Sequence, residues 1–293
     1  MLYLFLSILC STIILLLFKA FDKWSINTLV AIVVNYWVCV LIGILLSANS
    51  LQVGLNFSDY SWWGYAFFLG SIFVGAFYAV AYTTQQHGVV VTGIASKMSM
   101  VLPVAAAFYL YDDTLSMYKL FGLLLAICAI ILTSLPSAAS LNKDIRLSNL
   151  RFLFFPFLLF LIGGTIEIIF KHVQVHHLHT DIEHILFSLV LFGVAAVLGS
   201  LFLLFSAVRW GKAFNKNDLI AGILLGIPNF FSIYFLLQAL EKSGLQSSVL
   251  FPVNNIGIVS LSILLAYLLY NERLRAINWL GIACALLAIV LIT

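Results

Sequence analysis

The 293 residues are 63% hydrophobic and 9% charged, and the mean hydropathy is +1.14. A soluble globular domain carries about 25% charged residues, so this composition excludes that class and indicates an integral membrane protein. The formal net charge of +3 leaves no basic region suited to nucleic acid, and the four cysteines form no CxxC pair.

Apolar segments follow one another along the whole chain, and short connections between them carry most of the charge. The first segment lacks the basic start and the cleavage site of a signal peptide, so we expect it to be a membrane span. A helix that crosses a bilayer takes roughly 20 residues. We predict an all-α integral membrane protein with ten transmembrane helices, at about 2–18, 28–47, 62–84, 88–110, 117–134, 152–172, 184–206, 219–240, 245–270 and 275–292.

The basic residues are distributed unequally between the two sides that these spans imply. The odd-numbered connections hold ten Lys and Arg residues and the even-numbered ones hold three. Cytoplasmic connections carry the excess of Lys and Arg in membrane proteins. The odd-numbered connections are therefore predicted to be cytoplasmic, with both termini outside.

The two halves of the chain resemble each other at a nearly constant offset. Gly43 and Gly199 differ by 156 residues, and the offset stays between 153 and 159 elsewhere. Each half contains five spans, and an odd number makes the second half enter the membrane from the opposite side. We predict two inverted five-helix repeats, residues 1–136 and 151–293, joined by a loop at 137–150. Such repeats typically enclose a substrate site near the middle of the bilayer.

Two ionisable residues lie inside predicted spans. Lys97 is nine residues after Gly88 and fourteen before Tyr111, and Glu167 follows Gly163 and Gly164 in another span. A charge at the centre of a spanning helix costs on the order of 3 kcal/mol, so such residues usually face a wet interior or mark a transport path. We expect Lys97 and Glu167 to pair. The alternatives are a purely structural ion pair, or a Glu167 that is hydrated near the end of its span.

Proline and asparagine interrupt three of the spans. Pro103 and Pro228 should kink their helices, because proline frees a backbone carbonyl. Buried amides need partners in hydrocarbon, so Asn229, Asn254 and Asn255 are predicted to point into a central cavity. Ordinary hydrogen bonding between helices is the alternative.

Aromatic residues away from the membrane interfaces are further candidates for the cavity lining. Trp37 lies in the middle of the second span, and Tyr78 and Tyr82 lie on one face of the third. Such rings could flank the apolar part of a ligand or hold a cation. Simple packing between helices is the alternative for each.

The remaining polar residues point to no enzyme and no cofactor. Five histidines between His172 and His184 are expected to lie in a solvated connection, and zinc, nickel or copper binding there is the less favoured interpretation. No hydrolase, metalloprotease or nucleotide-binding motif is present, so the chain has no means of driving a pump by itself.

The ends of the fourth and ninth spans carry a family resemblance. LPVAAAFYLYDDTL at 102–115 and SILLAYLLYNERL at 262–274 each precede a span that contains a glycine, Gly122 or Gly281. In this respect the chain resembles the EamA-like members of the drug/metabolite transporter superfamily. The resemblance implies two inverted five-helix repeats, a central cavity and secondary transport of metabolites or drugs.

From these observations we expect a multi-pass transporter of the bacterial inner membrane whose partners are a small solute and the lipid bilayer. No obligate protein partner is evident. Lys97 would bind a carboxylate of the solute, and a proton could be coupled through Lys97 or Glu167. The alternatives are an exporter of cationic drugs, with Glu167 as the ligand, and a membrane scaffold without transport. The residues expected to contact the solute are Lys97, Asn229, Asn254, Asn255, Tyr78, Tyr82, Trp37 and Glu167.

Overall fold

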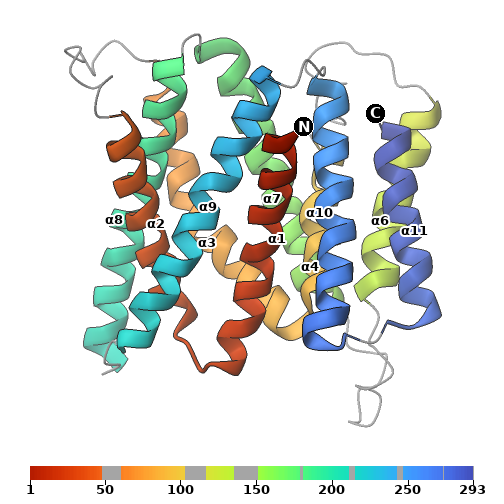
Figure 1. Ribbon diagram of the computed structural model, residues 1–293, viewed down its shortest axis with the longest axis horizontal. Coiled ribbons are helices and arrows are strands. Elements are labelled where there is room, and N and C mark those ends of the chain that lie inside the picture. Colours follow the sequence, from red (N-terminus) through yellow and green to blue (C-terminus); the bar gives the residue numbers. More distant parts are fainter. Residues whose placement is uncertain are drawn as a thin grey trace. The chain divides into compact units, whose positions relative to one another are not determined.

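A computed structural model of the protein describes residues 1–47, 61–102, 117–134, 151–178, 181–210, 215–242, 247–272 and 274–292 (Figure 1). All regular structure within these ranges is helical. The helices are α1 (Leu2–Lys23), α2 (Thr28–Ser47), α3 (Trp63–His87), α4 (Val89–Met98), α6 (Met117–Ser134), α7 (Arg151–His177), α8 (Asp181–Trp210), α9 (Lys216–Lys242), α10 (Ser247–Tyr270) and α11 (Ala276–Ile292).

Most of these helices are long and apolar enough to cross a membrane. This holds for seven of those described, namely α1, α2, α3, α7, α8, α9 and α10, whereas α4, α6 and α11 are apolar but shorter. A helix satisfies its backbone hydrogen bonds internally, which hydrocarbon requires. The expectation of an all-α, multi-pass membrane protein is confirmed, and ten separate spans stay a prediction.

Two helices differ in extent from the predicted spans. α7 continues through His177, and His184 lies in α8, so four of the five histidines expected in a connection lie on helices, and their placement in a connection was wrong. α4 ends at Met98, inside the predicted span 88–110, while the predicted kink at Pro103 lies outside the described residues. Pro103 nevertheless has no backbone N–H to offer the carbonyl of Ser99, which is a chemical reason for the early end.

The chain divides into two compact units. Unit 1 comprises Met1–Ala20, Ala79–Glu167 and Ser232–Thr293, and unit 2 comprises Phe21–Tyr78 and Ile168–Phe231. Each unit therefore takes segments from both predicted repeats. The repeat boundaries at 136 and 151 concern similarity within the sequence, which a division by compactness does not test, and they stay a prediction.

In unit 2, the contacts between α2 and α8 are reciprocal. A Cβ atom on Gly43 would lie 3.2 Å from Leu189 Cδ1, and one on Gly199 would lie 2.9 Å from Val33 Cγ2. The offset of 156 residues that relates Gly43 to Gly199 also relates Val33 to Leu189. Position numbers rise along α2 as they fall along α8, so the two helices run antiparallel. The glycine of α2 contacts a residue of α8, and the equivalent glycine of α8 contacts the equivalent residue of α2. Such an exchange of contacts is typical of a two-fold symmetric interface.

A second pair of glycines in unit 2 repeats this relationship. A Cβ atom on Gly70 would lie 2.8 Å from Val194 Cβ, and one on Gly226 would lie 2.6 Å from Val38 Cβ. The same offset of 156 residues relates Gly70 to Gly226 and Val38 to Val194. The absence of a Cβ at these four glycines lets the helix backbones approach closely, which is how small residues favour helix packing in membranes.

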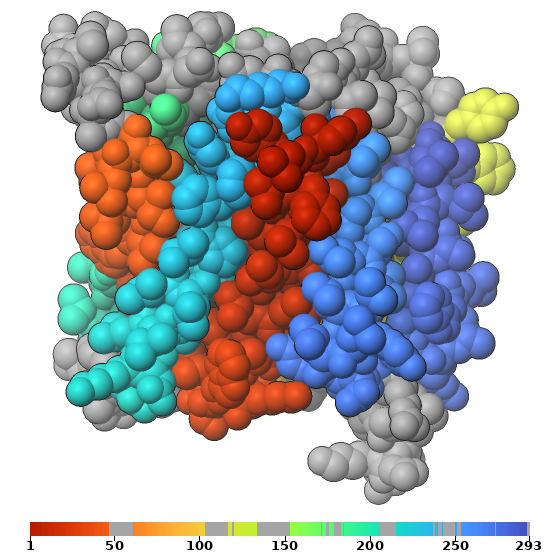
Figure 2. Space-filling model, viewed as in Figure 1, coloured from red at the N-terminus to blue at the C-terminus, as the bar shows by residue number. Residues whose placement is uncertain are grey.

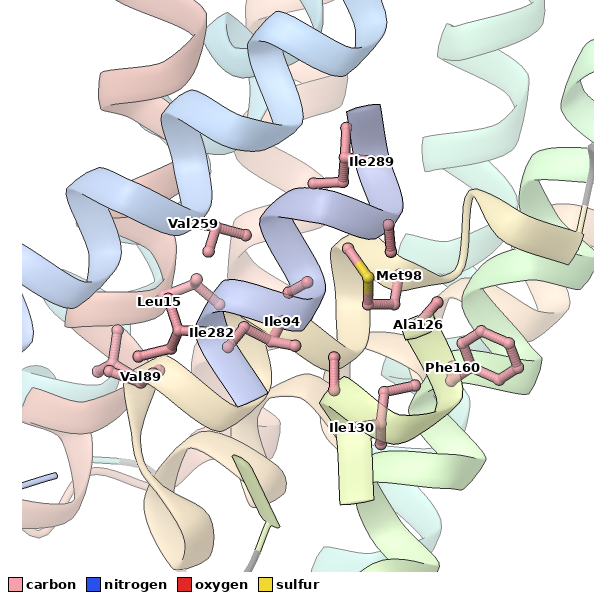
Figure 3. Packing of buried hydrophobic residues seen from close by; sticks show 14 of the residues in the cluster. Leu15, Val89, Ile94, Met98, Ala126, Ile130, Phe160, Val259, Ile282 and Ile289 are labelled. Carbon is pink, nitrogen blue, oxygen red and sulfur yellow. The ribbon is translucent and has the colours of Figure 1, made fainter. Parts of the chain in front are cut away.

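In unit 1, α4 packs against α10 and α6 packs against α11. Apolar side chains from these helices, together with Leu15 of α1 and Phe160 of α7, fill the space between them (Figure 3). Asn278 of α11 adds two polar contacts, because its Nδ2 donates to Leu132 O at 3.1 Å and to Thr133 O at 3.2 Å. These buried amide bonds fix α11 on the end of α6.

α10 and α11 lie side by side in Figure 2. Both helices carry large exposed apolar side chains, among them Leu264, Tyr267, Leu268, Trp279, Leu287 and Val290. An apolar outer face and a satisfied backbone are what contact with lipid chains requires.

The reciprocal glycines predict a stability difference between two alanine substitutions. Gly226→Ala would place a methyl group 2.6 Å from Val38 Cβ, whereas Gly193→Ala meets nothing within 4 Å. Overpacking of this kind typically costs about 1–3 kcal/mol. We expect Gly226→Ala to lower the thermal unfolding temperature of the protein in detergent and Gly193→Ala to leave it unchanged or raised. Equal unfolding temperatures for the two variants would contradict the close α2–α9 approach.

Candidate functional site

The centre of the candidate site is the interruption that follows α4. Ser99 and Met100 form a turn, and Val101 and Leu102 are again helical. Leu102 N donates to Ser99 O at 2.9 Å, a tighter bond than the i to i−4 bond of an α-helix. Lys97 lies in the last turn of α4, next to carbonyl groups that the helix no longer uses. The partial negative charge at a helix C-terminus favours a cation there.

A pair of glycines brings α7 against this interruption. A Cβ atom on Gly163 would lie 3.0 Å from Ser99 Cβ, and one on Gly164 would lie 2.6 Å from Leu102 Cβ. The α7 backbone can approach the turn only because both positions lack a side chain. Glu167 follows Gly163 by one helical turn, and this spacing directs its carboxylate to the same place.

The hydroxyl group of Ser99 connects the two helices. Ser99 Oγ lies 2.5 Å from Ser96 O and 3.1 Å from Glu167 Oε1, and both oxygens can accept its proton. Lys97 and Glu167 are both partly buried, and their ionised forms have opposite charge. Within the described ranges no direct ion pair joins them. The site therefore holds a cation, a carboxylate and a hydroxyl group inside the apolar part of the protein.

The polar groups of α10 complete this part of unit 1. Asn255 Nδ2 donates to Met100 Sδ at 3.1 Å, and sulfur is a weak acceptor. Asn254 is 4% exposed, and its Oδ1 and the buried Oγ of Ser96 have no hydrogen-bond partner among the described residues. An unsatisfied buried polar group costs on the order of 1–3 kcal/mol.

Tyr82 belongs to the same unit but contacts other aromatic groups. Its ring lies 4.3 Å from that of Phe155, between centroids. This contact joins α3 to α7 by aromatic packing, and packing between helices was the alternative interpretation of Tyr82. A role for Tyr82 in lining a cavity stays a prediction.

Asn229 lies in unit 2, where it forms a buried amide pair. Its Nδ2 donates to Asn35 Oδ1 at 3.1 Å and lies 3.5 Å from Cys39 Sγ. Asn35 is fully buried, and its own Nδ2 has no partner in the part of the chain that the structure describes. The pair joins α2 to α9. Sequence reasoning selected Asn229 but not Asn35, although Asn35 and Cys39 lie one helical turn apart and mark a polar face.

Trp37 and Tyr78 also lie in unit 2, and both are about half exposed, at 48% and 47%. Trp37 Nε1 donates to Ser200 Oγ at 3.0 Å. This bond satisfies the indole N–H, which a tryptophan away from the membrane interface needs. Contact of either residue with a solute stays a prediction.

The histidines of α7 form a cluster at its C-terminal end, beyond the apolar segment 153–170. The ring of His172 lies 4.5 Å from that of His176 and 5.8 Å from that of His177. Ser61 Oγ lies 2.7 Å from His177 Nδ1, and Tyr65 Oη lies 3.4 Å from His172 Nε2. Among the residues that the structure describes, no group of three His, Cys, Asp or Glu side chains is arranged to hold a metal ion.

Burial and the nearby charges of His176 and His177 lower the pKa of His172 below its ordinary value. The unfolded chain then binds a proton at His172 more readily than the folded protein does. The stability that neutral His172 contributes is present above its ordinary pKa and is lost as the pH falls. We expect the unfolding temperature to drop between about pH 7.5 and pH 5.5, around the usual histidine pKa of about 6.5.

Replacing His172 with glutamine should reduce this dependence, since the variant has one titrating group fewer. The measurement is the thermal unfolding temperature of both proteins across that pH range. An unchanged slope in His172→Gln would show that other groups cause the dependence.

A double-mutant cycle tests the electrostatic link between Lys97 and Glu167. Lys97→Met or Glu167→Gln alone leaves one charge in the apolar part of the protein without its counter-charge. We expect the double variant to be more stable than the sum of the single effects by about 1–3 kcal/mol. Lys242→Met combined with Glu167→Gln is the control, because Lys242 lies over the ring of Tyr3 instead. Additivity of the Lys97 and Glu167 effects within about 0.3 kcal/mol would contradict the link.

Comparison with known proteins identifies a relative that matches this chain over nearly its whole length. No model of a known protein family matches the sequence. One solved structure, titled only as the crystal structure of a protein, shares the fold, with a TM-score of 0.60, 14% sequence identity, and coverage of 98% of this chain and 97% of that one. An uncharacterized protein of Haemophilus influenzae is 30% identical over 289 residues, which cover 97% of this chain and 94% of that protein. The chain therefore belongs to the same family as this Haemophilus influenzae protein.

Proposed function

We propose that this protein is a secondary transporter, which moves a small metabolite with a carboxylate group across the bacterial inner membrane by alternating access. The observation that carries the proposal is the interrupted helix α4, which ends at Lys97–Met98 beside the carboxylate of Glu167. Transporters commonly bind substrates where a spanning helix is broken, because the break frees backbone groups and helix ends. A structural ion pair would need no such interruption.

The roles of the individual groups follow from their chemistry. Lys97 offers a cation with three donors, and it forms no direct ion pair within the described part of the chain that would compete with a solute carboxylate. Ser96 Oγ and Asn254 Oδ1 have no partner within the described ranges, and both could accept donors from the same solute. A solute with one anionic group and nearby N–H or O–H groups would satisfy these atoms.

Glu167 is the group best suited to carry a coupled proton. The single proton of the Ser99 hydroxyl cannot serve both Ser96 O, at 2.5 Å, and Glu167 Oε1, at 3.1 Å. A proton on Glu167 would complete the second bond by donating to Ser99 Oγ. Binding of an anion at Lys97 would in turn change the charge that Glu167 experiences, which couples the solute to the proton.

The reciprocal contacts of α2 and α8 support the inverted repeats that alternating access requires. Antiparallel helices with exchanged contacts at a constant offset of 156 residues are what an axis in the membrane plane produces. The resemblance of 102–115 and 262–274 to EamA-like transporters agrees with this architecture. Rocking of one repeat against the other would then expose the site to each side in turn.

A second candidate function is the export of cationic compounds. It is favoured by the contact of Glu167 with Ser99, which leaves the carboxylate without a direct ion pair to Lys97 in the described part of the chain. A cationic solute could then bind the Glu167 carboxylate directly and replace Lys97 as its counter-charge.

Transport assays in reconstituted vesicles separate the two candidates. Radiolabelled amino acids, dicarboxylates and quaternary ammonium compounds would first be screened for a rise in unfolding temperature, since a ligand stabilises the folded state. For a carboxylate solute, we expect Lys97→Gln to reduce uptake about 30-fold or more, the effect of losing a buried charge pair worth at least about 2 kcal/mol. Lys242→Gln, at the end of α9, is the matched control and should transport normally.

Two outcomes would count against the proposal. Full uptake of a carboxylate solute by Lys97→Gln would remove Lys97 from the binding site. Uptake of a quaternary ammonium compound that fails only in Glu167→Gln would favour the cation exporter.

A further inference from the structure

Side chains tie the ends of three helices together at one end of unit 1, the lower end in Figure 1. Tyr270, the last residue of α10, donates its hydroxyl to Leu16 O of α1 at 2.7 Å. Lys19 Nζ donates to Gln85 O at 3.3 Å, and Gln85 Nε2 donates to Phe18 O at 3.3 Å, so α1 is also tied to the end of α3. These are long-range bonds to backbone carbonyls, and Gln85 O belongs to the last turn of α3, where carbonyls have no partner within the helix.

The end of α10 directs a carboxylate towards the same place. Asn271 has a φ of 51°, its N–H donates to Tyr267 O at 3.1 Å, and Glu272 N donates to Ala266 O at 3.3 Å. Asn271 in the left-handed region, with its N–H bonded to Tyr267 O, is the αL ending of a helix, for which asparagine is one of the few suitable residues. It reverses the chain, so that Glu272 leaves the axis of α10.

Glu272 holds the start of α4. Its Oε1 accepts a hydrogen bond from Val89 N at 3.0 Å. Gly88 has a φ of 97°, and a Cβ atom there would lie 2.8 Å from Glu272 Oε1, so only glycine fits beneath the carboxylate. A negative charge at a helix N-terminus is favourable. We call these contacts the helix-end cluster; it consists of Glu272, Tyr270, Lys19 and Gln85. It joins the start of α4 to the ends of α1, α3 and α10.

α4 is therefore held at both ends by carboxylates from the second half of the chain. It has 10 residues, which corresponds to a rigid rod of about 15 Å. Glu272 binds its first N–H group, and Glu167 contacts Ser99 directly after its last turn. A displacement of the first turn is passed along the rod to Lys97, because a helix this short does not absorb it by bending.

We propose that Glu272 is a gating residue, and that the helix-end cluster holds the path to Lys97 closed on its own side of the membrane in this conformation. The cluster opens when Glu272 releases Val89, and α4 then moves with Lys97. This inference rests on the proposed transport function. By the distribution of basic residues, the closed side is the one predicted to be cytoplasmic.

Cysteine labelling from each side of the membrane tests the gate. The four native cysteines are replaced by alanine, Ser96→Cys supplies one thiol at the site, and a membrane-impermeant maleimide is applied to right-side-out and to inverted vesicles. In the parent protein, we expect faster labelling from the side opposite the cluster. Glu272→Ala should raise the rate from the cluster side about tenfold, the effect of losing one charge-assisted hydrogen bond. Glu272→Gln and Tyr270→Phe should change it in the same direction by less.

Asp218→Ala is the matched control, because Asp218 is a carboxylate that accepts N–H bonds at the start of α9, in unit 2. It should lower the unfolding temperature without changing the ratio of the two labelling rates. If Glu272→Ala behaves in the same way, Glu272 is only a helix cap and the gating proposal is overturned, while the transport proposal stands. If the thiol is labelled from neither side in any variant, no aqueous path reaches Ser96 and both proposals are overturned.

Discussion

Every polar group inside hydrocarbon must find a partner within the protein, and this requirement determines most of the structure. It makes the regular elements helical, and it explains why hydroxyl side chains return to carbonyl groups one turn back. Thr12, Thr83 and Thr133 bond in this way at 2.8, 2.7 and 2.6 Å. Among the described residues, the requirement is not met at Asn35 Nδ2 in unit 2, and at Ser96 Oγ and Asn254 Oδ1 in unit 1. The candidate site lies in unit 1, on the helices that carry two of these exceptions.

The second determinant of the structure is glycine, which has no side chain and therefore lets two helices come close together. In unit 2, glycines allow close contacts between α2 and α8 and repeat them at a constant offset. In unit 1, Gly163 and Gly164 bring α7 to the turn after α4 and so place Glu167 beside Ser99. The missing side chain of glycine thus allows helix packing in unit 2 and positions the Glu167 carboxylate in unit 1. A mutation at either glycine pair should therefore affect stability first, and the site only through Glu167.

Hydropathy was sufficient to predict the helices, because their apolar length is set by the membrane. It was also sufficient to select Lys97 and Glu167, since a charge in hydrocarbon stands out in any sequence. It did not predict the end of α4 at Met98, where Ser99 and Met100 form a turn. Nor did it predict that Glu272 caps α4, because hydropathy gives no distance between residues 183 positions apart. The histidines were misplaced for a related reason, since polar residues near a span end do not reveal where the helix stops.

The reciprocal framework of unit 2 carries unequal side chains. Asn35 and Asn229 form their amide pair once, and the positions 156 residues away hold Leu191 and Phe73. Two identical halves would give the inward-open and outward-open forms of a transporter equal free energies. An amide pair in one half and hydrocarbon in the other removes that degeneracy. Under the proposed transport function, the resting protein would favour one form, and binding of the solute or its co-substrate would supply the difference in free energy.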